Sequence, residues 1–405
     1  MQQQGQRRGG FSPFQVLPIE QTLQSFQWFD AMRRSQPVYH EEQSNTWHIF
    51  GYDDIRQVLT DTVHFSSENV PGFSEGTFLK GTVVAKDPPY HRKLRNLVNQ
   101  AFTPRAVNHL SGRVTEIAQG LLDDVRANGK MDVVKDIAFP FPAKVIAELL
   151  GVPANDWDIF RRWAGAEDGG EQQQQRQQSS PEQMMKARQT MESQMYDYFS
   201  RLLDERRRSP REDLISSLSV AEIDGERLNE NELVSFCILL LAAGQETTKN
   251  LIANALYCFT EDLDLQQRLR QDPALMPSTI EEVLRYLPPV WFTFRRTASD
   301  AEFGGQTIPA NSIVLVWNAS GNRDPEQFPN PDHFDARREP NRHLTFGHGI
   351  HFCIGAPLAR LEARILLPMM LEQLKDIRRV PDVPIVVRAG IVYVIQSLPI
   401  TFTAS

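Results

Sequence analysis

One cysteine near the end of the chain limits most strongly what this protein can become. Cys353 stands in the segment Phe346-Gly-His-Gly-Ile-His-Phe-Cys-Ile-Gly355, whose three glycines allow tight turns and a close approach of the backbone to a flat partner. A helix is expected to begin just after this cysteine, and the free N–H groups and the dipole at a helix start favour a thiolate. Zinc requires three or four ligands in closed spacing, whereas this thiolate stands alone. A single strong sulfur donor suits an axial position on a haem iron.

The same segment resembles the haem-binding loop of the cytochrome P450 family, Phe-Gly-x-Gly-x-His-x-Cys-x-Gly, and it agrees with that pattern at every fixed position. The resemblance implies that Cys353 is the metal ligand of a haem b, and that Phe346, Gly347 and Gly355 belong to the cofactor site. The alternative for a lone cysteine is a buried thiol in a loop.

Composition and charge argue against several classes of protein. The chain has 405 residues, 41% of them hydrophobic, and a formal net charge of −8. A negative balance gives no reason to expect nucleic acid as a partner, because phosphate neutralisation needs a basic surplus. No run of about 18 apolar residues is present, so we expect no membrane span. Residues 1–10 lack the apolar run of a secretory signal, so we expect a cytoplasmic protein. We also expect a monomer.

Hydrophobic periodicity predicts a mainly α-helical chain with small β-sheets at its two ends. The longest predicted helix covers residues 228–260, is apolar almost all round, and has a capping-box start at Asn229 and Glu232. Ser278 and Glu281 form a second capping-box pattern. The resemblance implies a single large domain with the P450 fold over residues 21–405, after a flexible tail over residues 1–20. The Gln-rich segment 172–178 is interpreted as an exposed connection between helices.

A second constellation, Ala243-Gly-Gln-Glu-Thr-Thr248, interrupts the longest apolar helix. Burying Glu246 and Thr247 costs free energy unless they are paired or used, and a local break in the helix ladder could admit a ligand. A solvated bend is the other interpretation. The pattern resembles the acid–alcohol pair of the family's oxygen-binding helix. That resemblance implies Glu246 for proton delivery, Thr247 for stabilising bound oxygen, and contact of Ala243 with the cofactor.

A third pattern, Glu282-x-x-Arg285, places both side chains on one helix face. Alone, it would indicate only a surface ion pair, which is weakly stabilising. It resembles the family's Glu-x-x-Arg signature, which implies a structural lock onto the irregular segment before the cysteine loop. We expect Arg338 as the third partner.

Two haem carboxylates need cationic partners, for which arginine is well suited. The segment Asp87-Pro-Pro-Tyr-His-Arg-Lys-Leu-Arg95 resembles the family's propionate-binding helix start, which implies His91 and Arg95. Arg295 corresponds to a further propionate arginine, although Arg296 stands next to it and the choice stays open. His351 completes the predicted set.

The resemblance implies that one oxygen atom of O2 enters a lipophilic substrate, such as a steroid, terpenoid, fatty acid or macrolide-like molecule. No dinucleotide-binding fingerprint is present, so a separate ferredoxin and its reductase should supply electrons, docking on basic residues 91–95. A peroxide-driven haem-thiolate enzyme and a non-catalytic haem sensor are the alternatives. The predicted substrate pocket comprises Phe73, Phe78, Leu239, Leu240, Val290, Trp291, Phe292, Thr293 and Val392.

Overall fold

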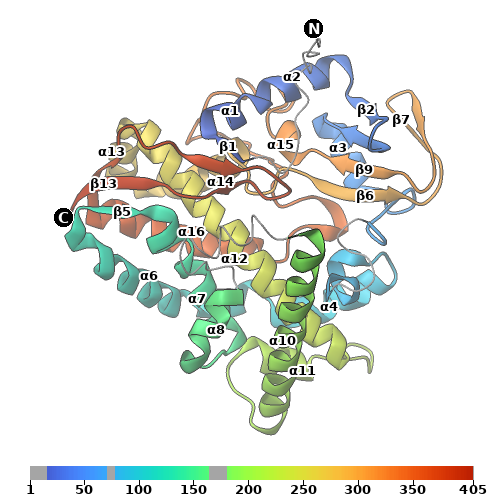
Figure 1. The fold of residues 1–405 in the computed structure, drawn as a ribbon, viewed down its shortest axis with the longest axis horizontal. Coiled ribbons are helices and arrows are strands. Elements are labelled where there is room, and N and C mark those ends of the chain that lie inside the picture. The colour runs from blue at the N-terminus through green and yellow to red at the C-terminus, as the bar shows by residue number, and fades with distance from the viewer. Residues whose placement is uncertain (1–15, 71–77, 164–179, 405) are drawn as a thin grey trace.

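Helices make up most of the chain that the computed structural model describes, which is residues 16–70, 78–163 and 180–404 (Figure 1). The α-helices are α1 (Ile19–Leu23), α2 (Ser25–Ser35), α3 (Tyr52–Thr60), α4 (Tyr90–Ala101), α5 (Pro104–His109), α6 (Ser111–Val125), α7 (Pro140–Leu150), α8 (Trp157–Trp163), α10 (Pro181–Arg208), α11 (Leu214–Val220), α12 (Glu230–Glu261), α13 (Leu263–Gln271), α14 (Met276–Tyr286), α15 (Asn318–Gly321) and α16 (Ala356–Gln373).

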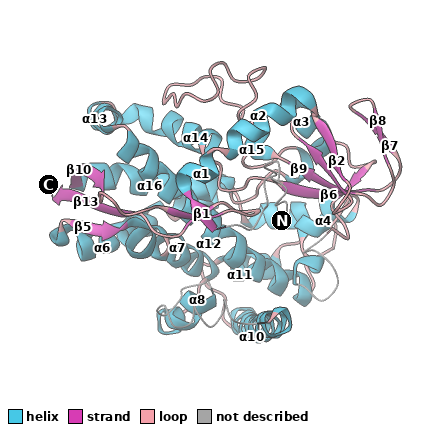
Figure 2. Cartoon of the chain, turned by 45° about the horizontal axis from the view of Figure 1, so that its top comes forward, coloured by secondary structure: helices cyan, strands magenta, loops and turns pink. Residues whose placement is uncertain are grey.

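The strands form small sheets, and Figure 2 shows two groups of them at opposite ends of the view. They are β1 (Val16–Pro18), β2 (Val38–Glu41), β3 (Thr46–Ile49), β4 (Phe65–Ser66), β5 (Lys130–Asp132), β6 (Thr293–Thr297), β7 (Ala301–Phe303), β8 (Gln306–Ile308), β9 (Ile313–Val316), β10 (Leu374–Arg379), β11 (Val386–Arg388), β12 (Val394–Ile395) and β13 (Pro399–Ala404). Their orders are β2-β3-β9-β6-β4, β10-β13-β5, β1-β11-β12 and β7-β8. The predicted fold class, mainly helical with small sheets, is confirmed.

Helix α12 crosses the middle of the molecule (Figure 1) and packs against α7, α10, α14 and α16. Its residues from Leu233 to Leu241 are buried without a break, as the all-round apolar sequence predicts. Asn229 accepts a hydrogen bond from the Glu232 N–H at 3.0 Å, and the Glu232 carboxylate accepts one from the Asn229 N–H at 2.8 Å. The predicted capping box therefore fixes the start of the central helix.

The predicted break in the α12 ladder at Gly244 is absent, because the helix is continuous from Glu230 to Glu261. A Cβ atom on residue 244 would lie 2.8 Å from Cδ1 of Ile146 on α7. The glycine therefore serves close packing of two helices, at a cost in intrinsic helix propensity of about 1 kcal/mol relative to alanine.

The second predicted capping box is wrong. Helix α14 begins at Met276, so Ser278 and Glu281 lie inside it, and the Ser278 hydroxyl donates to the Leu275 carbonyl at 3.0 Å. Pro277 explains the earlier start, because proline favours the first turn of a helix, where its missing N–H costs nothing.

The last residues of the expected flexible tail, 16–20, lie in regular structure. Strand β1 pairs antiparallel with β11, and α1 begins at Ile19, whose side chain is fully buried. Residues 1–15 and the Gln-rich segment lie outside the described residues. Within the part that is described, no helix is both long and apolar enough to traverse a bilayer.

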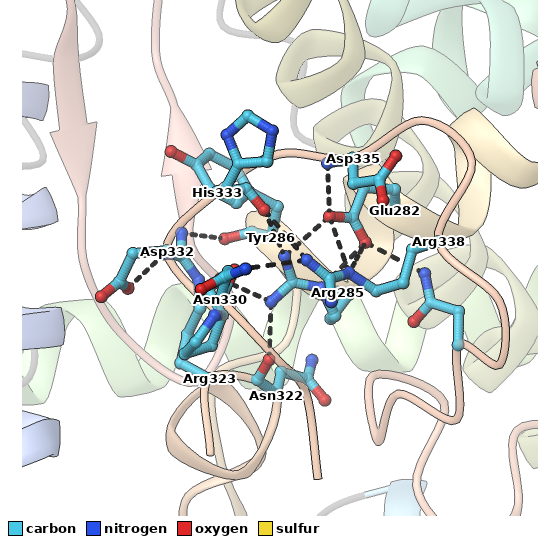
Figure 3. Close-up of polar contacts among 12 residues, drawn as sticks. Glu282, Arg285, Tyr286, Asn322, Arg323, Asn330, Asp332, His333, Asp335 and Arg338 are labelled. Atoms are coloured by element: carbon cyan, nitrogen blue, oxygen red, sulfur yellow. Dashed lines mark hydrogen bonds and ion pairs between the residues drawn. The ribbon is translucent and has the colours of Figure 1, made fainter. Parts of the chain in front are cut away.

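A buried cluster of charges joins α14 to the irregular segment 322–342 (Figure 3). Glu282 and Arg285 are both fully buried, and the guanidinium donates to both carboxylate oxygens at 2.8 and 2.7 Å. Arg338, the expected third partner, donates to the same carboxylate at 3.1 Å.

Arg285 also satisfies backbone carbonyls of the irregular segment, which has no helix or strand to pair them. Arg285 donates to the carbonyls of Asn322, Pro331 and His333 at 2.9, 2.8 and 3.2 Å, and Glu282 accepts from the Asp335 N–H at 2.9 Å. Because the segment contains no helix or strand, these bonds replace the ladder that would otherwise pair its backbone. The cluster thereby fixes the segment that leads into the cysteine loop.

We predict that Arg285→Met destabilises the protein by about 3–5 kcal/mol, because it leaves a buried carboxylate with only part of its compensation. The measurement is urea unfolding followed by far-UV circular dichroism. Arg268→Met is the matched control, since Arg268 forms a largely exposed pair with Asp262 at 3.2 Å and should change stability by less than about 0.5 kcal/mol. Equal effects of the two substitutions would contradict the assignment.

Candidate active site

The cysteine loop is folded tightly against α3. Gly347 and Gly349 have φ values of +73° and +70°, in the left-handed region that favours glycine. A Cβ atom on residue 349 would lie 2.7 Å from the carbonyl oxygen of Leu59, the penultimate residue of α3. Inside the loop, the Cys353 N–H donates to the Phe346 carbonyl at 2.9 Å. The glycines are therefore required by backbone conformation at both positions and by close approach at one.

Opposing influences act on the pKa of the Cys353 thiol. Burial raises the pKa of the thiol above its usual value, and the Gly355 and Ala356 N–H groups and the Arg95 and Arg360 cations offset that rise only in part. The two N–H groups belong to the start of α16, as the sequence predicts. Although protein atoms surround the sulfur closely, the residue keeps an accessible surface on the wall of an internal cavity. The surroundings suit a sulfur that is held as a thiolate by a positive partner.

That cavity, of about 360 Å³, lies between the cysteine loop and α12. Most of the residues predicted to bind the cofactor line it: Arg95, Ala243, Arg295, Phe346, Gly347, His351, Cys353 and Gly355. His91 is buried outside the wall, with its ring centroid 4.4 Å from that of His351. Segments far apart in the sequence thus meet around one space.

Two arginines face this cavity without an ion-pair partner among the described residues, although Asp87 acts on Arg295 from a distance. Among the described residues, no carboxylate lies within ion-pair distance of Arg95 or Arg295, and Arg295 donates only to the Phe294 carbonyl, at 2.7 Å. Burial lowers the pKa of Arg295 to about 10. Burial, together with Arg295, His91 and Arg95, lowers the pKa of His351 to about 3. An uncompensated cationic wall of this kind is suited to bind carboxylates.

Buried polar atoms without hydrogen-bond partners lie in the same wall, and they also favour a ligand with polar groups. The side-chain nitrogen and oxygen of Asn318 and the Thr293 hydroxyl are buried without a hydrogen-bond partner among the described residues. Buried polar groups normally have partners, so these atoms fit a ligand that carries polar groups. The residues present therefore fit a haem, with a sulfur donor for the iron, two cations for the propionates and further donors beside them.

The acid and the alcohol of α12 point to different surroundings. Thr247 lines the cavity, and its hydroxyl donates to the Ala243 carbonyl at 2.7 Å. Glu246 lies outside the wall and is 34% exposed, and Arg388 of β11 donates to it at 2.9 Å. Lys249 lies 3.8 Å from the same carboxylate oxygen. The sequence-based expectation of a deeply buried acid is therefore wrong, because a helix turns by about 100° between neighbours and separates these two side chains.

The predicted substrate pocket is only partly assembled. The cavity wall contains Leu239, Leu240, Val290, Phe292 and Thr293. Trp291 and Val392 lie outside it, because side chains alternate along extended backbone. The Trp291 ring instead stacks on Tyr393 at 5.0 Å, and Ile391 lines the cavity in place of Val392.

Two pocket predictions cannot be placed in this way. Phe73 lies outside the described residues, and Phe78 is described only as the first backbone position of a 3-10 turn, Phe78–Gly81. Sequence reasoning missed Asn318, Arg388 and Glu362 altogether. None of the three stands in a recognisable motif, and only burial and contacts single them out.

The expected basic docking patch over residues 91–95 is not a continuous surface. His91 is 3% exposed, Arg95 faces the cavity, and Lys93 forms an ion pair with Glu226 at 3.0 Å. Of the four basic residues, Arg92 alone is largely exposed. On an amphipathic helix, consecutive charges point in different directions, which the linear sequence hides.

Comparison with known proteins decides the family. A sequence profile described as Cytochrome P450 matches residues 16–151 and 176–385. The chain belongs to the cytochrome P450 family. It is 40% identical over 373 residues to Cytochrome P450 109 of Bacillus spizizenii, which covers 91% of this chain and 89% of that protein. It is 37% identical over 342 residues to Erythromycin C-12 hydroxylase of Saccharopolyspora erythraea, covering 84% of each.

Solved structures agree with that assignment. The crystal structure of CYP109E1 from Bacillus megaterium in complex with corticosterone matches with a TM-score of 0.86 at 35% identity, covering 94% of this chain and 99% of that one. The P450 fold, haem b as cofactor and the enzyme class of P450 monooxygenase, all expected from the sequence, are thereby confirmed.

Glu281 gives a pH test of how this P450 holds its cysteine loop. Its carboxylate accepts from Arg360 at 2.7 Å and lies 3.0 Å from His343, and Arg360 in turn lies over the Phe346 ring at 4.5 Å. Burial raises the pKa of Glu281, but hydrogen bonds from Arg360 and His343 outweigh it and lower the pKa from 4.5 to about 2. When a carboxyl group has a lower pKa in the folded state than in the unfolded state, its ionised form stabilises the folded protein at pH values above the unfolded pKa. That stabilisation is lost as pH falls toward the folded pKa.

We therefore predict that Glu281→Gln costs roughly 3 kcal/mol at pH 7, and that the difference from wild type disappears as pH falls from about 4.5 to 2. Free energies of unfolding measured across that range provide the check. Glu116→Gln, at a surface pair with Arg113, should show a small difference at every pH. A Glu281→Gln deficit that stays constant down to pH 2 would refute the explanation.

Proposed function

We propose that this P450 inserts one oxygen atom of O2 into a lipophilic polycyclic or macrocyclic substrate, with electrons supplied by a ferredoxin and its reductase. The observation that supports this proposal is the single cavity that brings together Cys353, two uncompensated arginines, the Thr247 hydroxyl and mainly apolar walls. When bound, the haem supplies the oxidising chemistry, and thiolate ligation favours O–O cleavage.

In this proposal the cofactor is held by residues of four separate segments, which are α4, α12, β6 and the cysteine loop. Cys353 would give the sulfur ligand, and Phe346, Gly347, Gly355 and Ala243 would contact the cofactor from the cavity wall. Arg95 and Arg295 bind the propionates, with His351 beside them, and His91 supports the His351 ring from behind. Charge-assisted hydrogen bonds from arginine to carboxylate are among the strongest in proteins, which suits permanent retention of a cofactor.

Proton delivery uses the two faces of α12. Glu246 is partly exposed and takes protons from solvent when its ion pair with Arg388 opens. Thr247 faces the cavity and can pass a proton inward by releasing its bond to the Ala243 carbonyl. The acid and the alcohol therefore act on different sides of α12, one toward solvent and one toward the cavity, which keeps bulk water away from the reacting atoms.

The cavity walls and the relatives both support a proposed substrate class. Phe292, Phe294, Leu239, Leu240 and Val83 give the cavity a predominantly apolar surface. One matched structure holds corticosterone, and one relative is named for hydroxylating erythromycin. We infer a rigid lipophilic substrate of steroid or macrolide type, which can fill such a cavity at a low cost in conformational entropy.

Cys353→Ala provides the first test. We expect the purified wild-type protein to contain haem and its ferrous carbonyl form to show the red-shifted Soret band typical of thiolate ligation, and the variant to lose that band. Cys258→Ala, which removes a buried thiol remote from the cavity wall, should keep it. A red-shifted band that survives in the Cys353 variant would overturn the ligand assignment.

Turnover separates the proposal from its alternatives. With corticosterone or an erythromycin-type macrolide as probe, ferredoxin, reductase and NADPH should give oxygenated product. Product formed only with added hydrogen peroxide would indicate a peroxide-driven enzyme, and no product with any donor across a lipophilic panel would indicate a sensor.

Thr247→Ala should uncouple the reaction while leaving haem content and substrate-induced Soret shifts unchanged. We expect the yield of product per O2 consumed to fall on the order of tenfold or more, with hydrogen peroxide released instead. Thr260→Ala is the control, since Thr260 also hydrogen-bonds a carbonyl of α12 but lies at the far end of the helix. Unchanged coupling in the Thr247 variant would remove the proposed role of the hydroxyl.

A further inference from the structure

A group of aromatic rings connects the wall of the haem cavity to α2. Phe292 lines the cavity, and its ring centroid lies 4.7 Å from that of Trp317, the residue that follows β9. The Trp317 ring lies 6.0 Å from the ring of Trp28 on α2. Trp317 is 1% exposed, whereas Trp28 is half-buried. Two indoles therefore join the cavity wall to a position that solvent can reach.

The indole N–H of Trp317 donates to a base. Its acceptor is Nδ1 of His48 on β3, at 3.0 Å, and the two ring planes differ by 13°. Burial lowers the pKa of the His48 imidazole to about 4, so the ring is neutral at neutral pH. Because Nδ1 accepts the bond, the proton of the neutral ring lies on Nε2. The Glu41 carboxylate lies 3.9 Å from that nitrogen.

This arrangement suits the removal of an electron and a proton together. An indole loses an electron more readily than a phenyl or an imidazole ring, and the loss makes its N–H strongly acidic. A hydrogen-bonded imidazole can then accept the proton, and a carboxylate near its other nitrogen favours the imidazolium that forms. The buried indole therefore stays uncharged after its oxidation, which avoids the cost of a second buried charge.

We propose that Trp317, with His48 as proton acceptor and Trp28 as the exit to solvent, removes oxidising equivalents from the cavity when no substrate C–H group is in reach. One electron passes from the Trp317 indole to the oxidised haem, which is reduced by one electron. The indole proton passes to Nδ1 of His48, leaving a neutral indolyl radical and an imidazolium. Trp28 then returns an electron to Trp317, the proton moves back from His48, and a soluble thiol or ascorbate reduces Trp28.

The distances favour this route over one direct step from the cavity to solvent. Electron tunnelling slows steeply with distance, so short steps between easily oxidised rings are faster than a single long one. An oxidant that is not removed would attack groups beside the haem, and the Cys353 thiolate is the most susceptible of them. The inferred role is therefore protection of the site, a function separate from oxygen insertion.

Electron paramagnetic resonance tests for the radical without turnover of any substrate. The haem-loaded protein is mixed with a peracid, which oxidises the haem directly, and is frozen within milliseconds. We expect the signal of a neutral tryptophan radical in wild type and its loss in Trp317→Phe. Trp47→Phe is the matched control, since Trp47 is a 7% exposed tryptophan of the same sheet whose ring stacks on His40. Absence of the signal in wild type, or its persistence in Trp317→Phe, would overturn the proposal.

His48→Phe tests the proton acceptor in the same experiment. It keeps an aromatic ring beside Trp317 but removes the base, so we expect the yield of the neutral radical to fall several-fold. In D2O the radical should form more slowly in wild type, because transfer of the indole proton accompanies the oxidation. A wild-type yield in His48→Phe would contradict the assigned role of the imidazole.

Loss of haem absorbance under hydrogen peroxide tests protection. Without substrate, Trp317→Phe and Trp28→Phe should bleach several-fold faster than wild type, and Trp47→Phe at the wild-type rate. The ferrous carbonyl spectrum of each variant reports whether its haem site is intact, and Trp28→Phe decides the outcome if Trp317→Phe does not fold. Equal bleaching rates in wild type and in Trp28→Phe would refute the exit to solvent. Neither ferredoxin nor substrate is used, so these outcomes are independent of the proposed oxygen insertion.

Discussion

The buried contact between Glu282, Arg285 and Arg338 is the constraint on which the rest of the site depends. It joins a regular helix to a segment of more than twenty residues, 322–342, that has no helix or strand of its own after α15, and it satisfies backbone groups at several points along that segment. A long irregular segment inside a folded core would otherwise leave unpaired backbone groups, which is costly. Because the cysteine loop begins shortly after the segment ends, the cluster holds the part of the chain that leads into the loop.

Charge in the cavity is distributed unevenly, and the distribution agrees with the proposed function. The wall near the cysteine loop has cations without anions, in Arg95 and Arg295, while the junction of α12 and α16 has a single acid without a cation, Glu362. The first arrangement suits binding of a cofactor that carries two carboxylates. Both arrangements leave ionisable groups of the cavity wall without ion-pair partners among the described residues, which is typical of sites that are optimised for function.

The sequence alone predicts the parts of this enzyme that depend on local patterns. The cysteine loop, the capped start of α12 and the Glu282–Arg285 pair each occupy consecutive or helix-spaced positions, so their spacing carries the information. Prediction from the sequence fails where the role of a residue depends on the direction of its side chain in the folded protein. Glu246 faces Arg388, Trp291 faces Tyr393, and three of the four basic residues over 91–95 do not form a surface patch.

Tertiary partners that are distant in the sequence are also invisible to pattern reasoning. Arg388 and Glu246 are 142 residues apart, and nothing local marks Arg388 as the partner of an acid on α12. The same applies to Asn318 and Glu362, whose importance lies in what they lack in the folded state. An unsatisfied atom has no sequence signature.

The small sheet β1-β11-β12 carries a consequence for recombination between relatives. It joins residues near the beginning of the described chain to those near its end, because Val16–Pro18 pair with Val386–Arg388. The same strand β11 presents Arg388 to Glu246, and the turn that follows it contributes Ile391 to the cavity. In chimaeras of P450 parents, β1 and β11 should therefore come from the same parent. A chimaera that takes them from different parents would disturb the pairing in this sheet and, with it, the cavity wall near Ile391.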